Sequence, residues 1–149
     1  MKNVVLAAAL VATTLTGFGA VAPALAEETN PSIVHRKATY SVVGGHLHSL
    51  KAILFLGGQG DATYHAESIK VAFEHMGNAY PAGSDKGETK AKAEIWSNMD
   101  DFKARGKDSY GATVALIEAT KGGDKAAMAG AFKKLAGTCK ACHKEYRAK

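Results

Sequence analysis

Apolar residues in this sequence recur at alternating steps of three and four positions, and this spacing limits the fold more than any other feature. Such steps place side chains on one face of an α-helix, whereas a half-buried β-strand requires strict alternation. Four stretches show the helical pattern. The two clearest run through Tyr40, Val43, Leu47, Leu50 and Leu54, and through Met128, Phe132, Leu135, Cys139, Cys142 and Tyr146. The other two contain Ala62, Ile69, Phe73 and Met76, and Ile95, Met99, Phe102, Tyr110, Val114 and Ile117.

Helix start and stop signals separate these stretches. Asn30 before Pro31, Asp61 and Asp124 are side chains that favour the N-cap position, and Pro is favoured in a first turn. Glycines end the first three expected helices, at 57–58, near 77 and at 122–123. The third of these helices is expected over Glu94–Thr120. Residues 81–90 contain Pro, Ser and two glycines and are the longest expected loop.

Short connections at 57–60 and 121–123 make the joined helices antiparallel neighbours. Apolar seams with steps of three and four favour helices that cross at about 20°, as in helical bundles. The sequence therefore predicts an all-α protein, an antiparallel four-helix bundle in one domain.

The first 26 residues have the features of an export signal. Lys2 precedes an apolar stretch, and Ala24-Leu25-Ala26 is a cleavage site of the A-x-A kind. An uncleaved membrane anchor is the alternative, because a span needs about 20 residues. We expect a signal peptide at 1–26, a bundle at 27–149 and a periplasmic protein. Cleavage removes Lys2 and lowers the formal net charge from +5 to +4.

Charge and cysteine content exclude two classes of protein. The 19 Lys and Arg residues outnumber the 14 Asp and Glu residues, but they are interspersed with acids and form no basic run. A nucleic-acid binder concentrates its positive charge on one face or arm, so none is expected here. Only Cys139 and Cys142 are present, too few for a disulfide-based scaffold.

The sequence Cys139-Lys140-Ala141-Cys142-His143 is the C-x-x-C-H attachment motif of c-type haem. Two thiols at this spacing can form thioether bonds to the two vinyl groups of one porphyrin. The adjacent His143 then lies below the iron as its axial ligand. On a helix, Cys139 and His143 are about 40° apart, so both face one side. The motif predicts one haem c per chain.

Three alternatives use the same residues. A thioredoxin-type motif begins a helix after a strand, whereas this motif ends a helix. A structural zinc site needs four ligands, so histidines of other helices (His46, His48, His65 or His75) would have to join it. A simple disulfide between the two cysteines is the third.

With this motif at its end, the chain resembles cytochrome c′, the class II c-type cytochromes. The resemblance covers essentially all of the chain after residue 26, and its matching segments are His35–Leu50, Lys90–Trp96 and, most specifically, Thr138–Arg147. Mitochondrial-type cytochromes carry the motif near the N-terminus instead. The resemblance implies a four-helix bundle with haem held by its last helix.

Family members with a sixth iron ligand carry Met on the first helix, and Tyr40 occupies the matching position here. The resemblance thus implies five-coordinate, high-spin iron bound by His143, with an apolar distal pocket under Tyr40. His46 and His48 lie about 9 and 12 Å farther along the helix, too far to replace it. The resemblance also implies haem contacts for Arg36, Lys37, Thr89 and Lys90, and a basic residue, Arg147, beside His143.

Two functions fit such a site. One is electron transfer, in which the positive charge steers an acidic redox partner. The alternative is binding of NO or CO, for scavenging or carriage. A peroxidase needs a distal base, and no His lies at the depth of Tyr40, so we do not expect an enzyme. We expect no nucleic-acid partner, no membrane span after cleavage and possible homodimers through the first two helices.

Overall fold

The computed structural model describes residues 29–149, so the predicted signal peptide lies outside the described residues. The helices of the described part are α1 (Pro31–Phe55), α2 (Ala62–Glu74), α3 (Glu94–Ser97), α4 (Met99–Gly122) and α5 (Lys125–Tyr146). Over the same residues there is no strand, and one isolated bridge joins Ala91 to Arg147. No helix within 29–149 combines the length and apolarity that a membrane span requires.

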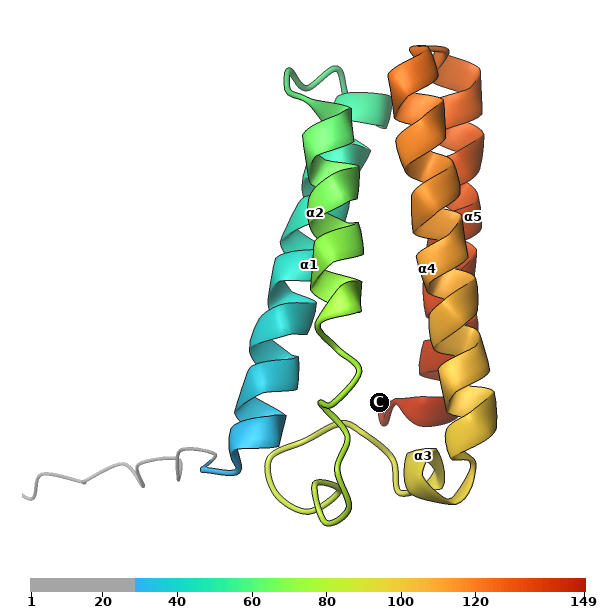
Figure 1. Ribbon diagram of the computed structural model, residues 1–149. Coiled ribbons are helices and arrows are strands. Elements are labelled where there is room, and N and C mark those ends of the chain that lie inside the picture. Colours follow the sequence, from blue (N-terminus) through green and yellow to red (C-terminus); the bar gives the residue numbers. More distant parts are fainter. Residues whose placement is uncertain (1–28) are drawn as a thin grey trace, which may run out of the picture.

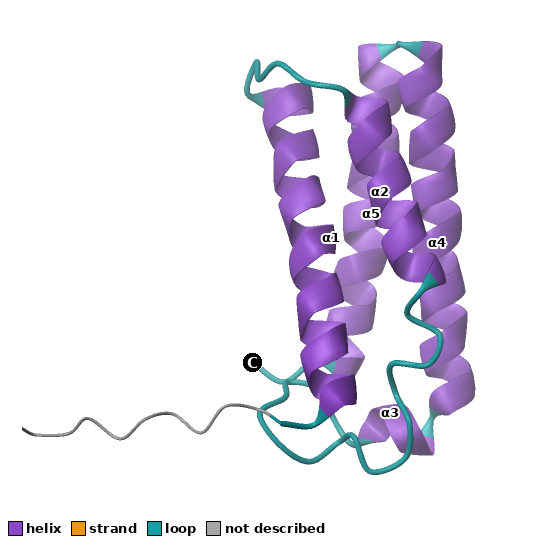
Figure 2. Ribbon diagram, turned by 60° about the vertical axis from the view of Figure 1, so that its left-hand side comes forward, coloured by secondary structure: helices purple, strands orange, loops and turns teal. Residues whose placement is uncertain are grey.

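Two antiparallel helical pairs form the bundle. Figure 1 shows α1 and α2 joined by a short turn at the top, and α4 and α5 joined by another at the same end. The long segment 75–93 passes below the bundle and connects α2 to the short α3 and then to α4 (Figures 1 and 2). The predicted all-α antiparallel four-helix bundle is confirmed.

The predicted N-caps hold the starts of three helices. The Asn30 side chain accepts hydrogen bonds from the backbone N–H groups of Ser32 and Ile33, at 3.0 and 3.4 Å. Asp61 and Asp124 accept one backbone bond each, at 3.0 and 2.7 Å. Each bond pairs a donor that a helix leaves unsatisfied in its first turn. At the far end of α4, Gly123 has φ +75°, the left-handed conformation that favours glycine.

Two boundaries differ from the predictions. α2 ends at Glu74, before the expected Gly77. The third predicted helix is interrupted at Asn98, whose φ of −129° and ψ of 44° leave the helical region and separate α3 from α4. The side chains of Ser97 and Asn98 both bond to the carbonyl of Glu94, at 3.2 Å. Polar side chains that bond back to the preceding turn compete with continuation of a helix.

The apolar core occupies the half of the bundle near the two helical turns, which we call the core end. Its buried residues come from all four long helices: Val43, Leu50, Ala66, Ile69, Ala112, Leu116, Ile117 and Leu135. The other half contains the start of α1, the segment 75–98, the start of α4 and the end of α5, and we call it the site end. In α4, every buried side chain lies at Ser109 or beyond, so the site end receives little of the apolar core.

Candidate haem site

The C-x-x-C-H motif lies in the last two turns of α5, at the site end. α5 is continuous to Tyr146, so Cys139 lies about one helical turn before the adjacent residues Cys142 and His143. Both thiols are free and half-buried, and the His143 side chain is exposed. The motif therefore presents two thiols and an imidazole from one helix.

The protonation of these groups follows from their surroundings. Burial raises the pKa of both cysteine thiols, so they are protonated at neutral pH. Partial burial, and secondarily the positive charge of Arg147, lower the pKa of His143. At neutral pH this imidazole is neutral and has a nitrogen lone pair available to a metal.

These features disfavour the alternatives for the motif. A redox-active thiol of the thioredoxin type has a lowered pKa, and here both are raised. Within residues 29–149, no group of three or more His, Cys, Asp or Glu side chains is placed to hold a metal ion, as structural zinc would need. The two thiols are unlinked, so the structure contains no disulfide in this motif.

Tyr40 of α1 faces His143 across the space between the two helices. Their ring centroids are 6.5 Å apart, and the ring planes meet at 69°. The Tyr80 hydroxyl donates a hydrogen bond to the Tyr40 hydroxyl at 3.4 Å. Burial and the neighbouring Tyr80 raise the pKa of Tyr40 far above its ordinary value, so it remains a neutral phenol. Two hydroxyl groups therefore lie beside the space that was expected to be apolar.

The residues around this space fit a haem group. α1 and α5 contact each other only sparsely, although the other neighbouring long helices pack closely. Tyr40 is a bulky side chain that points toward the bundle, yet it is 37% exposed. Two free thiols and a neutral imidazole face the same space. The donor set therefore matches covalent attachment and axial ligation of a c-type haem.

Arg36 anchors the segment that closes the site end. It is only 3% exposed, and its guanidinium donates to Ser84 and Thr89 side chains at 2.9 and 2.8 Å and to the carbonyls of Ala79 and Ser84. It also lies over the ring of Tyr80, 5.1 Å from the centroid. A buried cation in this number of hydrogen bonds is well satisfied, and it joins α1 to residues 79–89.

The other residues predicted to contact haem lie on the same segment or, in the case of Lys37 of α1, against it. Lys37 is exposed and donates to the carbonyl of Glu88 at 3.2 Å. Thr89 accepts from Arg36 and from the backbone of Ala91, at 2.8 and 3.1 Å. The carbonyl of Lys90 accepts from the backbone of Ala148 at 2.8 Å. The structure thus brings the predicted residues to one end of the bundle, next to the end of α5.

We call the contacts between residues 89–92 and the end of α5 the C-terminal clamp. The backbone of Lys92 donates to the carbonyl of Tyr146 at 3.1 Å, and the Lys92 ammonium donates to the carbonyl of Glu145 at 2.8 Å. The Tyr146 hydroxyl donates to Asp101 of α4 at 2.5 Å. The clamp fixes the turn that follows His143.

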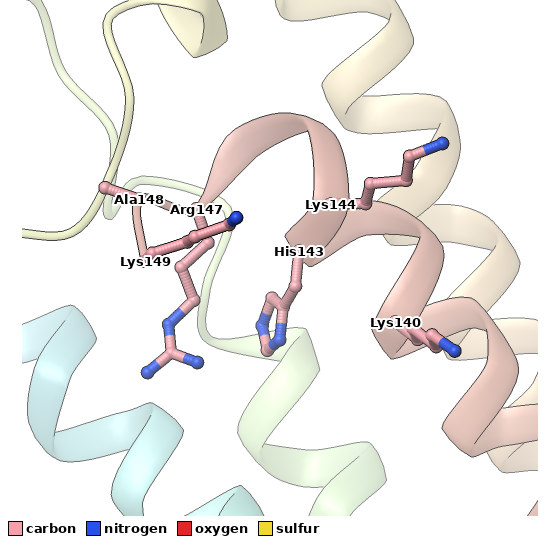
Figure 3. Close-up of a pocket in the computed structure, with 6 residues that line it drawn as sticks. All are labelled: Lys140, His143, Lys144, Arg147, Ala148 and Lys149. Atoms are coloured by element: carbon pink, nitrogen blue, oxygen red, sulfur yellow. The ribbon is translucent and has the colours of Figure 1, made fainter.

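A basic hollow lies beside His143. It has a volume of about 540 Å³, and its lining residues are Lys140, His143, Lys144, Arg147, Ala148 and Lys149. Figure 3 shows the Arg147 and His143 side chains next to each other on the same side of the helix, as predicted for a basic residue beside the ligand. The exposed rim of the site is therefore positively charged.

Sequence reasoning missed Tyr80 and the clamp. Tyr80 follows the predicted end of the second helix and has no periodic partner, so no pattern places it over Tyr40. The aromatic side chains Tyr80, Trp96, Phe102 and Tyr146 form a chain of ring contacts with centroids 4.7–6.0 Å apart. The only available signal was the high density of aromatic residues near the loop.

Comparison with known proteins agrees with the site. The family model described as Cytochrome C′ matches residues 32–147. A cytochrome c′ of Rhodospirillum rubrum is 37% identical over 99% of both chains. Among solved structures, a cytochrome c′ described as having an unusual ligand-controlled dimer dissociation has a TM-score of 0.73 and 32% identity, covering 79% of this chain and 95% of its own. A nitric oxide complex of a variant cytochrome c′ from Alcaligenes xylosoxidans has a TM-score of 0.73 and 25% identity, covering 79% and 94%.

A helical bundle whose last helix carries C-x-x-C-H defines a class of c-type haem proteins. The family match extends over nearly all of the described residues. The chain belongs to the cytochrome c′ family, and its family implies a c-type haem.

Proposed function

We propose that the chain carries one haem c, bound through Cys139 and Cys142 and ligated by His143, and that it transfers electrons in the periplasm. The observation that carries this proposal is the pairing of His143 with Tyr40 across the haem space. The position that holds Met in six-coordinate relatives holds a neutral phenol here. The iron is then five-coordinate and high-spin, with His143 as its protein ligand.

In this proposal haem supplies a one-electron iron couple and an axial position open to small gases. The residues around it hold and orient it. Cys139 and Cys142 provide the two covalent links, and the neutral His143 provides a nitrogen lone pair. Tyr40, restrained by Tyr80, covers the opposite side and limits access to small molecules.

The wall of the site is proposed to act in two ways. Arg36 and Thr89 hold the segment that borders the haem, and their mutual hydrogen bond supports this role. Lys37 and Lys90 place exposed positive charge near the same edge, where carboxylate groups of haem would be stabilised.

The basic rim around His143 supports an acidic redox partner. Lys140, Lys144, Arg147 and Lys149 surround the hollow beside the ligand. Complementary charge steers the encounter of two proteins and raises the association rate at low salt. The predicted export signal at 1–26, followed by the predicted bundle at 27–149, supports location in the periplasm.

Binding of NO or CO is a second candidate function, favoured by the same open axial position under Tyr40. The nitric oxide complex of the Alcaligenes relative supports it. The Tyr40 and Tyr80 hydroxyls add hydrogen-bonding groups near the position where a gas would lie. A homodimer through α1 and α2 is also proposed, since both helices expose apolar side chains, among them Val42 and Val71, each about half exposed.

The optical spectrum of the purified protein tests the iron site. It is recorded oxidised, reduced, and reduced with CO or NO. A broad reduced visible band that changes sharply with CO or NO supports the open position. Split bands that do not respond to CO would contradict it, and the absence of a haem band from an export-competent host would refute haem attachment.

Replacement of Tyr40 by Met sharpens the test. Tyr40→Met places a thioether opposite His143, and we expect it to convert the reduced spectrum to sharp, split bands with a weak CO response. Val42→Met is the matched control, because Val42 lies two residues away on α1 and is 50% exposed. An unchanged spectrum in Tyr40→Met would show that the residue does not lie over the iron.

A further inference from the structure

Two histidines outside the haem site meet between α1 and α2. Nδ1 of His46 and Nδ1 of His65 are 2.8 Å apart, and their ring centroids are 5.1 Å apart. The two histidines occupy equivalent positions on their helices. His46 lies three residues after Val43 and four before Leu50, both of which face the core. His65 lies three residues after Ala62 and four before Ile69, which also face the core. Both are half-buried at the edge of the core, where solvent reaches them.

The pair is held in position from two sides. The helices that carry the two rings are fixed by the adjacent buried residues of the core end. The Tyr64 ring lies edge-on to both imidazoles, with centroids 5.8 Å from His46 and 5.2 Å from His65. A chelating pair that is already in position loses less conformational entropy when it binds a ligand.

We propose that His46 and His65 form a binding site for a divalent copper ion, bound through both Nδ1 atoms. Nitrogen is a favoured ligand of Cu²⁺, which prefers a square or tetragonal arrangement. With metal–nitrogen bonds of about 2.0 Å, two ligands at right angles are about 2.8 Å apart. A tetrahedral ion such as Zn²⁺ needs about 3.3 Å between them. The observed separation therefore fits adjacent corners of a square.

The hydrogen bond between the two rings is compatible with this role. Without metal, one Nδ1–H donates to the other Nδ1. When copper binds both Nδ1 atoms, that hydrogen leaves Nδ1 and the same ring carries a hydrogen on Nε2 instead. One imidazole of the pair therefore changes its tautomer when the ion binds.

The rest of the coordination sphere is solvent. Within residues 29–149, no third His, Cys, Asp or Glu completes a metal-binding group with these two. Water molecules fill the remaining corners, which makes the site an open one. His46 lies on the same helix as Tyr40, six residues or about 9 Å farther along. The copper site does not depend on the proposed function of the haem.

Copper titration of the haem-loaded protein tests the proposal, with CuCl₂ as the probe. Pulsed electron paramagnetic resonance counts the imidazoles that bind the ion. We expect one Cu²⁺ per chain with two coordinated imidazoles. A single coordinated imidazole in the unmodified protein, or no saturable binding, would overturn the proposal without any variant.

Three variants then identify the ligands. Loss of a residue that only hydrogen-bonds to a metal ligand weakens metal binding by about 10–100-fold. Loss of a ligand itself, in His46→Gln or His65→Gln, should therefore weaken copper binding by at least about tenfold. His48→Gln, an exposed histidine of the same helix, should bind as the unmodified protein does. Helical circular dichroism and the haem spectrum confirm folding. Equal copper affinity in all three variants would show adventitious binding and overturn the site.

Discussion

The core end and the site end of the bundle are stabilised by different interactions. At the core end, Leu50, Ile69, Leu116 and Leu135 are fully buried and pack against one another across the helices. At the site end, a buried cation, Arg36, makes hydrogen bonds to a long segment without regular structure, beside two buried isoleucines and the chain of aromatic ring contacts. The difference indicates that apolar burial stabilises the bundle, whereas polar contacts determine the shape of the haem site.

The largest expected effect on stability lies at the core end. Leu116→Ala removes a fully buried side chain and should lower the free energy of unfolding by about 2–5 kcal/mol. Urea unfolding measures the loss. Leu56→Ala is the control, because Leu56 is 73% exposed, and surface changes usually stay within about 0.5 kcal/mol. We expect the CO response to be unchanged in both, and a loss of that response in Leu116→Ala would break the separation of the two ends.

A smaller loss of stability, with a larger effect on the haem site, is expected for Arg36→Met. The variant leaves the acceptors of Ser84 and Thr89 without their donor, which should cost about 1–3 kcal/mol. Cleavage within residues 75–93 by a protease should become faster, and this rate is the measurement. Lys37→Met, the adjacent and exposed lysine, should leave it nearly unchanged. Similar rates for both variants would mean that the buried network does not hold the segment.

A gain in stability is expected for Gly106→Ala, in the part of α4 that lacks apolar burial. Nothing lies within 4 Å of a Cβ at this position, and Ala is favoured over Gly in a helix by about 0.5–1 kcal/mol. Urea unfolding should show that gain. Gly60→Ala provides the contrast, because its φ is +154° and a Cβ would lie 2.9 Å from Ile53. It should be destabilising, and a gain there would contradict this account of the turn.

The smallest effect concerns acid stability at the start of α4, where Asp101 contacts the end of α5. The Arg105 side chain, and secondarily the Tyr146 hydroxyl, lower the pKa of Asp101. The native state therefore binds fewer protons than the unfolded state, so this stabilisation is complete above the ordinary pKa of about 3.9. It is lost as the pH falls through the lowered value.

Asp101→Asn should flatten the acid limb of a plot of stability against pH, measured by urea unfolding at several pH values. Asp100→Asn, in the same first turn of α4, is the control for a negative charge near a helix start. An equal slope in both variants would show that the contact with Arg105 and Tyr146 contributes nothing specific.

Local features of the fold were predictable from the sequence, and tertiary ones were not. Asn30, Asp61 and Asp124 cap helices as predicted, because capping depends on residues a few positions apart. The contact of His46 with His65 was not predicted, because it depends on how α1 and α2 pack. The haem motif could be read directly because its function depends on spacing along one helix.

Arg36 shows the limit of prediction by resemblance. It was expected at the haem edge, and the structure adds four hydrogen bonds to the segment 79–89. These bonds join residues more than 40 positions apart, which no local pattern shows. The roles of Arg36, Lys37, Thr89 and Lys90 toward haem stay predictions.

The C-terminal clamp has a consequence for the order of folding. Its contact between Lys92 and Glu145 joins residues that are 53 positions apart in the sequence. The turns at the core end, in contrast, join helices that are consecutive in the sequence. Long-range closure costs more chain entropy than local contacts do, and it tends to occur late. We therefore expect the helical pairs to associate first, while the end of α5 still projects into solvent. Under the proposed covalent attachment of haem, Cys139 and Cys142 would be accessible to attaching enzymes during that interval, and closing of the clamp would end it.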